Sequence, residues 1–510
     1  MFVPQLHLGA WGLCALVILI LARVLVRRLQ ILHFKRQTGA QHARNLDRPM
    51  GLFGLKFAAL TIREVKAGRL FALLTENLRV SGPTYQTVVL GRTTLNTVDV
   101  DNARSILTNV TDYGVSNRMG PGGWAPFADG GIFVSDGHEW QAGRAMVRPA
   151  LSRAEISQLD KVETHVAALV RRIPRDGHTV DLQALFLDMT LDSAMDFLLG
   201  VGTTESLTAA EAADKAAFAR AVDYCGDQLM VRMRTPPVVR KLFFREERKF
   251  VDAALASRDY ITQIVAKQAA KIELEKDQSG DSKGYILADE LLRVTKGDQE
   301  ETRRQVASVL IAARDTTALL LSHAFFALAR HPDIWAKLQK EVAELGGRKP
   351  SYEDLKSMRY LKYVLNETLR FYAIVPSNAR WANKDATMPR GGGPDGRAPC
   401  FVPKGAFIII YLFAMFRDKN VYGPDADEFR PERWGEDLRP GWYFLPFSAG
   451  PRVCPGQQFA LIEASYTIVR LMQEFTRIES RDPRPYQPRI RVSVASANGV
   501  LVGLYKDEKP

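Results

Sequence analysis

The 510-residue sequence predicts a mainly α-helical protein with a small β region. Three stretches carry apolar residues at helical spacing and are too long for strands: residues 182–198, 209–233 and 300–330. The stretch Val88–Thr94 instead predicts two short strands around a turn. No linker rich in Pro, Gly or Ser divides the rest of the chain, so these elements belong to one large domain.

The N-terminal segment predicts a membrane anchor. Leu8–Val26 is apolar except for Arg23, and a basic cluster follows it. About 20 apolar residues span a bilayer, and basic residues after the span keep the remaining chain cytosolic. A cleaved signal peptide would carry its positive charge before the apolar core. We therefore predict a signal anchor over residues 1–30, a basic, Pro-bearing hinge over 31–60, and the main domain over 61–510.

Charge and cysteine content restrict the partners and the compartment. A net charge of +12 and an isoelectric point near 9.4 suit nucleic acid, an anionic membrane or an acidic protein. No nucleic-acid motif occurs and the basic residues are dispersed, so we favour a membrane surface and an acidic redox partner and expect no nucleic acid. The four cysteines form no C-x-x-C pair, which indicates a reducing compartment without a disulfide framework or zinc site.

A Gly- and Pro-rich loop near the C-terminus contains the most informative cysteine, Cys454. The loop, Phe447–Gly456, directly precedes an expected helix that starts at Gln457. The partial positive charge of a helix N-terminus and nearby backbone N–H groups favour a thiolate, which can be an axial iron ligand. A buried structural cysteine is the alternative interpretation.

The spacing of Phe447, Gly450, Arg452, Cys454 and Gly456 fills the pattern F-x-x-G-x-R-x-C-x-G. Through this loop the chain resembles the cytochrome P-450 family of haem-thiolate monooxygenases. The resemblance implies that Cys454 ligates haem iron and that Arg452 pairs with a haem propionate. It also implies the family's mainly helical fold, with haem b held between a long helix and the Cys454 loop.

Further motifs occur in the family's order. Trp140 and Arg144 form W-x-x-x-R on one helix face, and in isolation they would be a surface cation–aromatic pair. The resemblance assigns both side chains to the haem propionates, with Arg380 as a further partner.

A second set of motif residues is expected to stabilise the scaffold. Glu367 and Arg370 match E-x-x-R, and Arg433 completes the family's Glu-Arg-Arg triad. Most such pairs are exposed and contribute little, but the resemblance implies a buried structural lock near the cysteine loop.

The segment Ala312–Thr317 lies inside the expected helix over 300–330. A Thr within a helix can bond back to a carbonyl one turn earlier, and a neighbouring Asp can relay protons. The segment resembles the family's A/G-G-x-D/E-T-T oxygen-activation motif, which implies that Thr316 organises an oxygen-bound water chain and that Asp315 carries protons. Ala313 replaces the usual Gly and narrows the expected space over the iron.

The R-G-G-G-P-D-G string at 390–396 resembles the fungal n-alkane and fatty-acid hydroxylase group. No P-loop Lys-Ser/Thr follows it, so nucleotide binding is excluded. Ala313 and Ala373 depart from that group, which has Pro at the latter position, so we favour tailoring of a fungal secondary metabolite, polyketide-like or otherwise lipophilic. Terminal hydroxylation of n-alkanes or fatty acids is the alternative. Candidate cavity residues, placed by resemblance, are Trp124, Phe127, Val309, Ala312, Ala313, Ile374 and Val375.

The resemblance also implies the partners and the location. Because the sequence contains no flavin or nicotinamide motif, electrons would come from NADPH through a separate flavoprotein, NADPH–cytochrome P-450 reductase, with cytochrome b5 as a further candidate donor. We expect a single-pass protein of the endoplasmic reticulum membrane with a cytosolic catalytic domain. A haem-based ligand carrier or a haem-thiolate isomerase or dehydratase would not need Asp315 and Thr316.

Two further expectations concern local sequence. The charged stretch over 271–283 predicts a mobile surface loop. Pro455 follows the expected ligand and has no N–H. Our hypothesis is that one hydrogen bond to the sulfur is absent, which leaves a more electron-rich thiolate and a lower iron potential.

Overall fold

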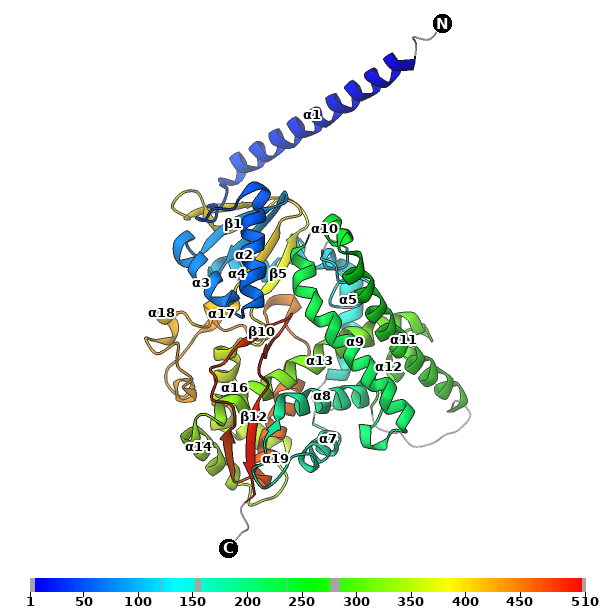
Figure 1. The fold of residues 1–510 in the computed structure, drawn as a ribbon, viewed down its shortest axis with the longest axis vertical. Coiled ribbons are helices and arrows are strands. Elements are labelled where there is room, and N and C mark those ends of the chain that lie inside the picture. The colour runs from blue at the N-terminus through cyan, green and yellow to red at the C-terminus, as the bar shows by residue number, and fades with distance from the viewer. Residues whose placement is uncertain (1–4, 121, 152–156, 236, 276–284, 507–510) are drawn as a thin grey trace.

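The computed structural model describes residues 5–120, 122–151, 157–235, 237–275 and 285–506. The first helix, α1 (Gln5–Thr38), projects from the body of the molecule as a single rod (Figure 1). The side chains of α1 are described from Ala15 onward, and the large apolar ones between Leu16 and Leu32 are mostly exposed. The helix continues past residue 30, where we predicted the hinge to begin.

The β-rich part of the body follows α1. A five-stranded sheet has the order β1 (Thr84–Val89), β2 (Arg92–Thr97), β8 (Phe407–Ile410), β5 (Asn378–Ala382) and β3 (Tyr113–Gly114). Within this sheet β2 and β8 pair in parallel, and the other neighbouring strands pair antiparallel. The hairpin of β6 (Ala386–Gly392) and β7 (Ala398–Val402) lies beside the sheet. Three helices belong to this part: α2 (Leu55–Lys66), α3 (Leu70–Ser81) and α4 (Val100–Thr108).

The larger, helical part of the body fills the other side of the molecule (Figure 1). Its longer helices are α5 (Gly137–Val147), α7 (Leu159–Arg171), α8 (Leu182–Leu199), α9 (Ala209–Arg234), α11 (Phe244–Glu275), α13 (Gln299–Leu328), α14 (Pro332–Ala343), α16 (Arg359–Tyr372) and α19 (Gln457–Glu474). Shorter ones are α10 (Pro237–Leu242), α12 (Leu287–Val294), α15 (Tyr352–Ser357), α17 (Leu412–Met415) and α18 (Lys419–Tyr422). Small sheets combine β4 (Val180–Asp181), β12 (Leu501–Tyr505) and β9 (Arg477–Ser480), and β10 (Pro488–Ile490) with β11 (Val494–Ser496).

Helix α13 runs through the core. Asp298 caps it by accepting a hydrogen bond from the Glu301 N–H at 3.0 Å, and the helix then packs against α8, α11, α16 and α19. Among the residues whose side chains the structure describes, which leave out the first ten residues of α1, α13 is the one helix long and apolar enough to cross a membrane, but 67% of its apolar window is buried inside the protein. It is therefore the central helix of the domain.

Most predicted elements agree with the structure. The stretches predicted as helices correspond to α8, α9 and α13, and Val88–Thr94 comprises the end of β1, a turn at 90–91 and the start of β2, as predicted. The predicted loop over 271–283 is wrong for residues 271–275, which complete α11. Lys and Glu also favour helices, so their abundance did not distinguish a loop from a helix end. The remainder of that stretch, 276–284, lies outside the described residues.

Candidate active site

The loop before α19 holds Cys454 in a defined position. The Cys454 N–H donates to the Phe447 carbonyl at 2.9 Å, and Gly450 adopts a φ of +70°. A Cβ at Gly450 would lie 2.3 Å from the Leu107 carbonyl oxygen, so this turn requires glycine. Burial raises the pKa of the Cys454 thiol, while a hydrogen bond from the Gly456 N–H and the charge of Arg144 partly lower it. The loop thus presents a sulfur next to a donor and a cation.

Three arginines beside this loop have buried atoms without a partner. The Nε atoms of Arg118, Arg380 and Arg452 find no hydrogen-bond acceptor within the part of the chain that the structure describes. Burial and repulsion by Arg452 lower the pKa of Arg118 to about 10. Burial, followed by repulsion from the other two arginines, lowers the pKa of Arg380 to about 9. Such shifts are expected where buried cations lack counter-charge.

One carboxylate offsets part of this positive charge. Asp136 accepts a hydrogen bond from Arg452 Nη2 at 2.6 Å. Three guanidinium groups and one carboxylate leave two positive charges uncompensated. The unpaired Nε atoms could donate hydrogen bonds to the carboxylates of a ligand. Haem carries two propionates, so the charge and the donors of this arginine cradle (Arg118, Arg380, Arg452) fit a haem. Arg118 was missed by the sequence analysis because no motif or spacing marks it.

Trp140 and Arg144 lie on α5 against the cradle. The Arg452 guanidinium lies over the Trp140 ring at 4.3 Å, and the Arg144 guanidinium lies 5.9 Å from the same ring. Arg144 is also close enough to Cys454 for the sulfur to affect its pKa. The structure therefore brings together the five side chains that we assigned to the cofactor: Trp140, Arg144, Arg380, Arg452 and Cys454.

The middle of α13 has small side chains that retain exposed surface. Ala312, Ala313 and Thr316 are partly exposed although the following turns are fully buried. The Thr316 Oγ1 donates to the Ala312 carbonyl at 2.8 Å, as a threonine within a helix is expected to do. Small residues therefore present accessible surface on one side of this otherwise buried helix.

Asp315, the neighbour of Thr316, points into a network of charges. Its carboxylate lies 3.2 Å from Arg314 and 3.6 Å from Arg491, which follows strand β10. Both arginines also pair with Asp223 on α9, at 2.8 and 3.2 Å. The network (Asp223, Arg314, Asp315, Arg491) joins α9, α13 and the β10–β11 hairpin. No sequence motif had linked Arg491 to Asp315.

The remaining cavity candidates are partly exposed or fully buried. Val375 is partly exposed, as are the two alanines of α13. Trp124, Phe127, Val309 and Ile374 are buried, each less than 10% exposed. Trp124 lies against the arginine cradle, since the Arg118 guanidinium is 5.3 Å from its ring.

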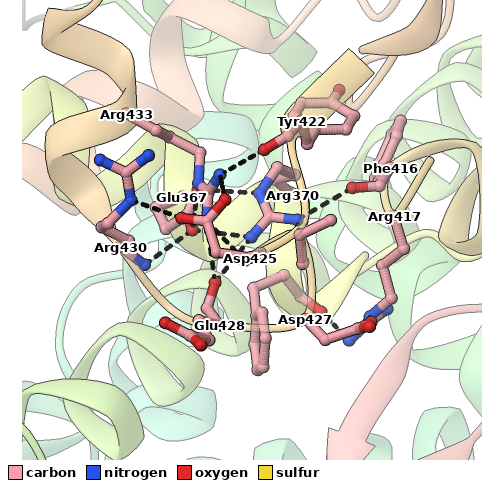
Figure 2. A network of polar contacts seen from close by, with 12 residues as sticks. Glu367, Arg370, Phe416, Arg417, Tyr422, Asp425, Asp427, Glu428, Arg430 and Arg433 are labelled. Carbon is pink, nitrogen blue, oxygen red and sulfur yellow. Dashed lines mark hydrogen bonds and ion pairs between the residues drawn. The ribbon is translucent and has the colours of Figure 1, made fainter. Parts of the chain in front are cut away.

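The predicted scaffold residues form a buried network (Figure 2). Glu367 accepts hydrogen bonds from Arg370 Nη2 at 2.7 Å and from Arg433 Nε at 3.0 Å, and all three side chains are buried. Arg370 also donates to the carbonyls of Phe416 and Ala426. The network therefore fixes the segment that leads from β8 towards the Cys454 loop onto α16.

Comparison with known proteins agrees with this geometry. The family model "Cytochrome P-450" matches residues 53–500. Cytochrome P-450 monooxygenase himC of Aspergillus japonicus is 40% identical over 479 residues, which cover 92% of this chain and 85% of himC. Cytochrome P-450 monooxygenase fsdH of Fusarium heterosporum is 38% identical over 470 residues, which cover 89% of this chain and 81% of fsdH. Cytochrome P-450 52A12 of Debaryomyces hansenii is 38% identical over 464 residues, which cover 86% of this chain and 87% of that relative.

Proposed function

The chain belongs to the cytochrome P-450 family, and from this premise we propose that it is a membrane-bound monooxygenase that hydroxylates a lipophilic fungal secondary metabolite. Members of the family are haem-thiolate enzymes that take electrons from a redox partner. Cys454 would ligate the haem iron, and the arginine cradle with Trp140 and Arg144 would hold the propionates. When bound, the haem supplies the oxygen chemistry, and a thiolate ligand favours O–O cleavage.

The middle turn of α13 would manage the protons. The Thr316 hydroxyl donates its one hydrogen to the Ala312 carbonyl. Its oxygen can therefore act only as an acceptor towards water. Asp315, which directly precedes Thr316 and belongs to the charge network, would exchange protons with that water. In this proposal Thr316 positions water and Asp315 moves the proton.

Helix α1 supports a membrane location. Its exposed leucines, isoleucines and valines would be costly in water and suit the hydrocarbon core of a bilayer. We propose a single-pass anchor of the endoplasmic reticulum, with the domain on the cytosolic side. NADPH–cytochrome P-450 reductase would be the electron donor, and cytochrome b5 a second one.

The observation that carries the choice of substrate class is the backbone at Ala373. This residue ends α16 with φ +44° and ψ +64°, directly before the cavity candidates Ile374 and Val375. Proline cannot adopt this conformation, because its ring fixes φ near −65°. The n-alkane and fatty-acid hydroxylase group usually has Pro at this place, and a chain with Pro there would have to turn differently from this one. A differently shaped cavity wall, together with Ala313, favours a tailoring substrate over a linear chain.

The test uses microsomes that contain this protein and a fungal reductase. A reduced carbon-monoxide difference spectrum first verifies a thiolate-ligated haem. NADPH is then added with a mixture of long-chain fatty acids and alkanes, and products are identified by mass spectrometry. We expect intact haem and no terminally hydroxylated product, and a deletion strain should then accumulate an under-oxidised metabolite. Terminally hydroxylated chains would instead establish the alternative function, hydroxylation of n-alkanes or fatty acids.

A further inference from the structure

The R-G-G-G-P-D-G string has no part in the proposed chemistry, yet the structure gives it a specific environment. It forms the end of β6 and the turn to β7. The chain that leaves the anchor helix lies against this hairpin. We call residues 386–402 the β6–β7 platform and residues 39–46 the linker.

The linker pairs with the platform like an added strand. The Gln41 N–H donates to the Pro399 carbonyl at 2.8 Å, and the Phe401 N–H donates to the Gln41 carbonyl at 2.7 Å. One residue later, the Gly393 N–H donates to the His42 carbonyl at 3.0 Å. Ala43 forms a further bridge with Gly392. These backbone bonds hold the linker in a fixed register.

Consecutive glycines of the string allow this close approach. Gly393 has a φ of +78°, and a Cβ there would lie 2.7 Å from the Gln41 side-chain oxygen. Gly391 has a φ of +101°, and a Cβ would lie 2.3 Å from the Thr84 side chain. Any other residue would be strained at both positions because φ is positive, and at Gly391 it would also collide with the short Thr84 side chain. The glycine run thus serves the contact between the platform, the linker and the sheet.

Side chains extend the contact along the anchor helix itself. Arg27 makes a bidentate ion pair with Asp385, with N–O distances of 2.6 and 2.5 Å. Asp385 also accepts the Lys404 N–H at 2.8 Å, and these donors keep its pKa below the usual range although burial acts to raise it. The Phe34 ring lies 5.7 Å from that of Phe401. Arg27 and Phe34 are about two helical turns apart, so the contacts restrain the tilt of α1 as well as its position.

We infer that the β6–β7 platform is a docking surface for the anchor and its linker, which sets one orientation of the catalytic domain against the membrane. The inference rests on the proposed function, in which α1 spans the bilayer. A linker attached at a single point would let the domain swing freely. Together, the contacts at Arg27, Phe34 and Gln41–Ala43 would hold the domain in a fixed orientation relative to α1. The domain would then face its membrane-bound reductase in one orientation.

Hydrogen exchange of the full-length, haem-loaded protein in lipid nanodiscs tests the inference. We expect slow exchange in peptides that contain Gln41, Gly393 and Phe401, and roughly fivefold faster exchange there in Arg27→Gln. Arg27 lies outside the domain, so this variant cannot unfold it. Arg28→Gln is the matched control, because it removes the same charge from the same helix and Arg28 has no ion pair among the described residues. The control should exchange like the wild type.

A second variant approaches the contact from the domain. Asp385→Asn should accelerate the same peptides, and the double variant with Arg27→Gln should add little, since both changes remove one interaction. With purified reductase, Arg27→Gln should raise the reductase concentration needed for half-maximal turnover by about threefold and leave substrate binding unchanged. Arg28→Gln should alter neither value.

The outcomes separate the inference from the proposed function. Fast exchange of the linker in the wild type, or identical exchange in all variants, would overturn docking. Flotation with lipid vesicles and the carbon-monoxide spectrum are recorded on the same preparations. A protein that floats and forms the haem-thiolate spectrum but shows an unprotected linker disproves only the docking. A protected linker in a protein that does not float disproves the anchor.

Discussion

Two groups of buried arginines differ in how their charge is balanced. In the scaffold network, Glu367 is bonded to Arg370 and Arg433, and Asp425 is a second carboxylate that pairs with Arg433 at 3.2 Å. Glu367, Arg370 and Arg433 have no unpaired buried side-chain atom in the described structure. In the arginine cradle, Arg118 and Arg380 keep unpaired Nε atoms and lowered pKa values. Charges that stabilise the fold are neutralised by the chain itself, whereas charges that await a ligand are not.

The largest effect is expected when the balanced network is broken. Glu367→Ala leaves buried Arg370 without a carboxylate and buried Arg433 with Asp425 alone, and breaking a buried ion pair typically costs about 3–5 kcal/mol. We expect a low yield of haem-loaded protein. Circular dichroism should show a much lower unfolding temperature or no cooperative thermal transition. Glu436→Ala is the control, because that carboxylate also pairs with an arginine, Arg430, but is 57% exposed. It should cost at most about 1 kcal/mol. Equal losses in both variants would show that the buried network has no special role.

A buried carboxyl group, Glu463 on α19, extends the comparison because its hydrogen-bond partner is a hydroxyl and not an arginine. Ser193 Oγ lies 2.5 Å from its carboxylate, and burial raises its pKa to about 7. Its pKa in the unfolded chain is about 4.3, so Glu463 stabilises the protonated folded protein fully below that value. This contribution is lost as the pH rises through the folded-state pKa near 7, and in total it amounts to roughly 4 kcal/mol.

Glu463→Gln should remove that pH dependence. Denaturant unfolding at pH 5 and pH 8 should give a smaller difference in the free energy of unfolding for Glu463→Gln than for the wild type, by up to roughly 3 kcal/mol. Glu344→Gln, at an exposed position, should keep the wild-type difference. If Glu463→Gln retains it as well, the carboxylate is charged in the folded protein and has a partner that compensates it.

In the unbalanced cradle, the sign of the effect should depend on the ligand. Arg380→Met removes a buried, repelling charge, so the haem-free protein should gain stability. The haem-loaded protein should lose haem faster by about thirtyfold, since a hydrogen bond to a charged group contributes about 2 kcal/mol. Haem transfer to an acceptor protein and thermal unfolding of both forms measure the two effects. Destabilisation of the haem-free form would mean that Arg380 belongs to the scaffold.

The smallest effect concerns the sulfur itself. The Gly456 N–H already bonds to Cys454, and Pro455 offers no second N–H. Pro455→Leu should supply one and raise the reduction potential of the iron by roughly 40 mV, equivalent to a hydrogen bond of about 1 kcal/mol. Spectroelectrochemical titration measures the potential, and an unchanged value would remove the hypothesis of an electron-rich thiolate.

Local sequence was sufficient for the elements whose chemistry depends on short spacing. The Cys454 loop, the W-x-x-x-R pair on α5 and the Thr316 turn of α13 each lie within one element, so a motif could identify them. Periodicity located the long helices for the same reason, because a helix face repeats within the sequence itself.

Contacts between distant segments were decided only by the tertiary structure. Arg118 joins the cradle, and Arg491 reaches Asp315, because folding brings a turn and a hairpin to residues far away in the chain. The R-G-G-G-P-D-G string indicated a relative, but the neighbours that crowd its glycines, Thr84 at Gly391 and Gln41 of the linker at Gly393, are known only from the tertiary structure. The physical reason is that a buried charge or a close backbone approach depends on which partner arrives, and spacing along one segment carries no information about that partner.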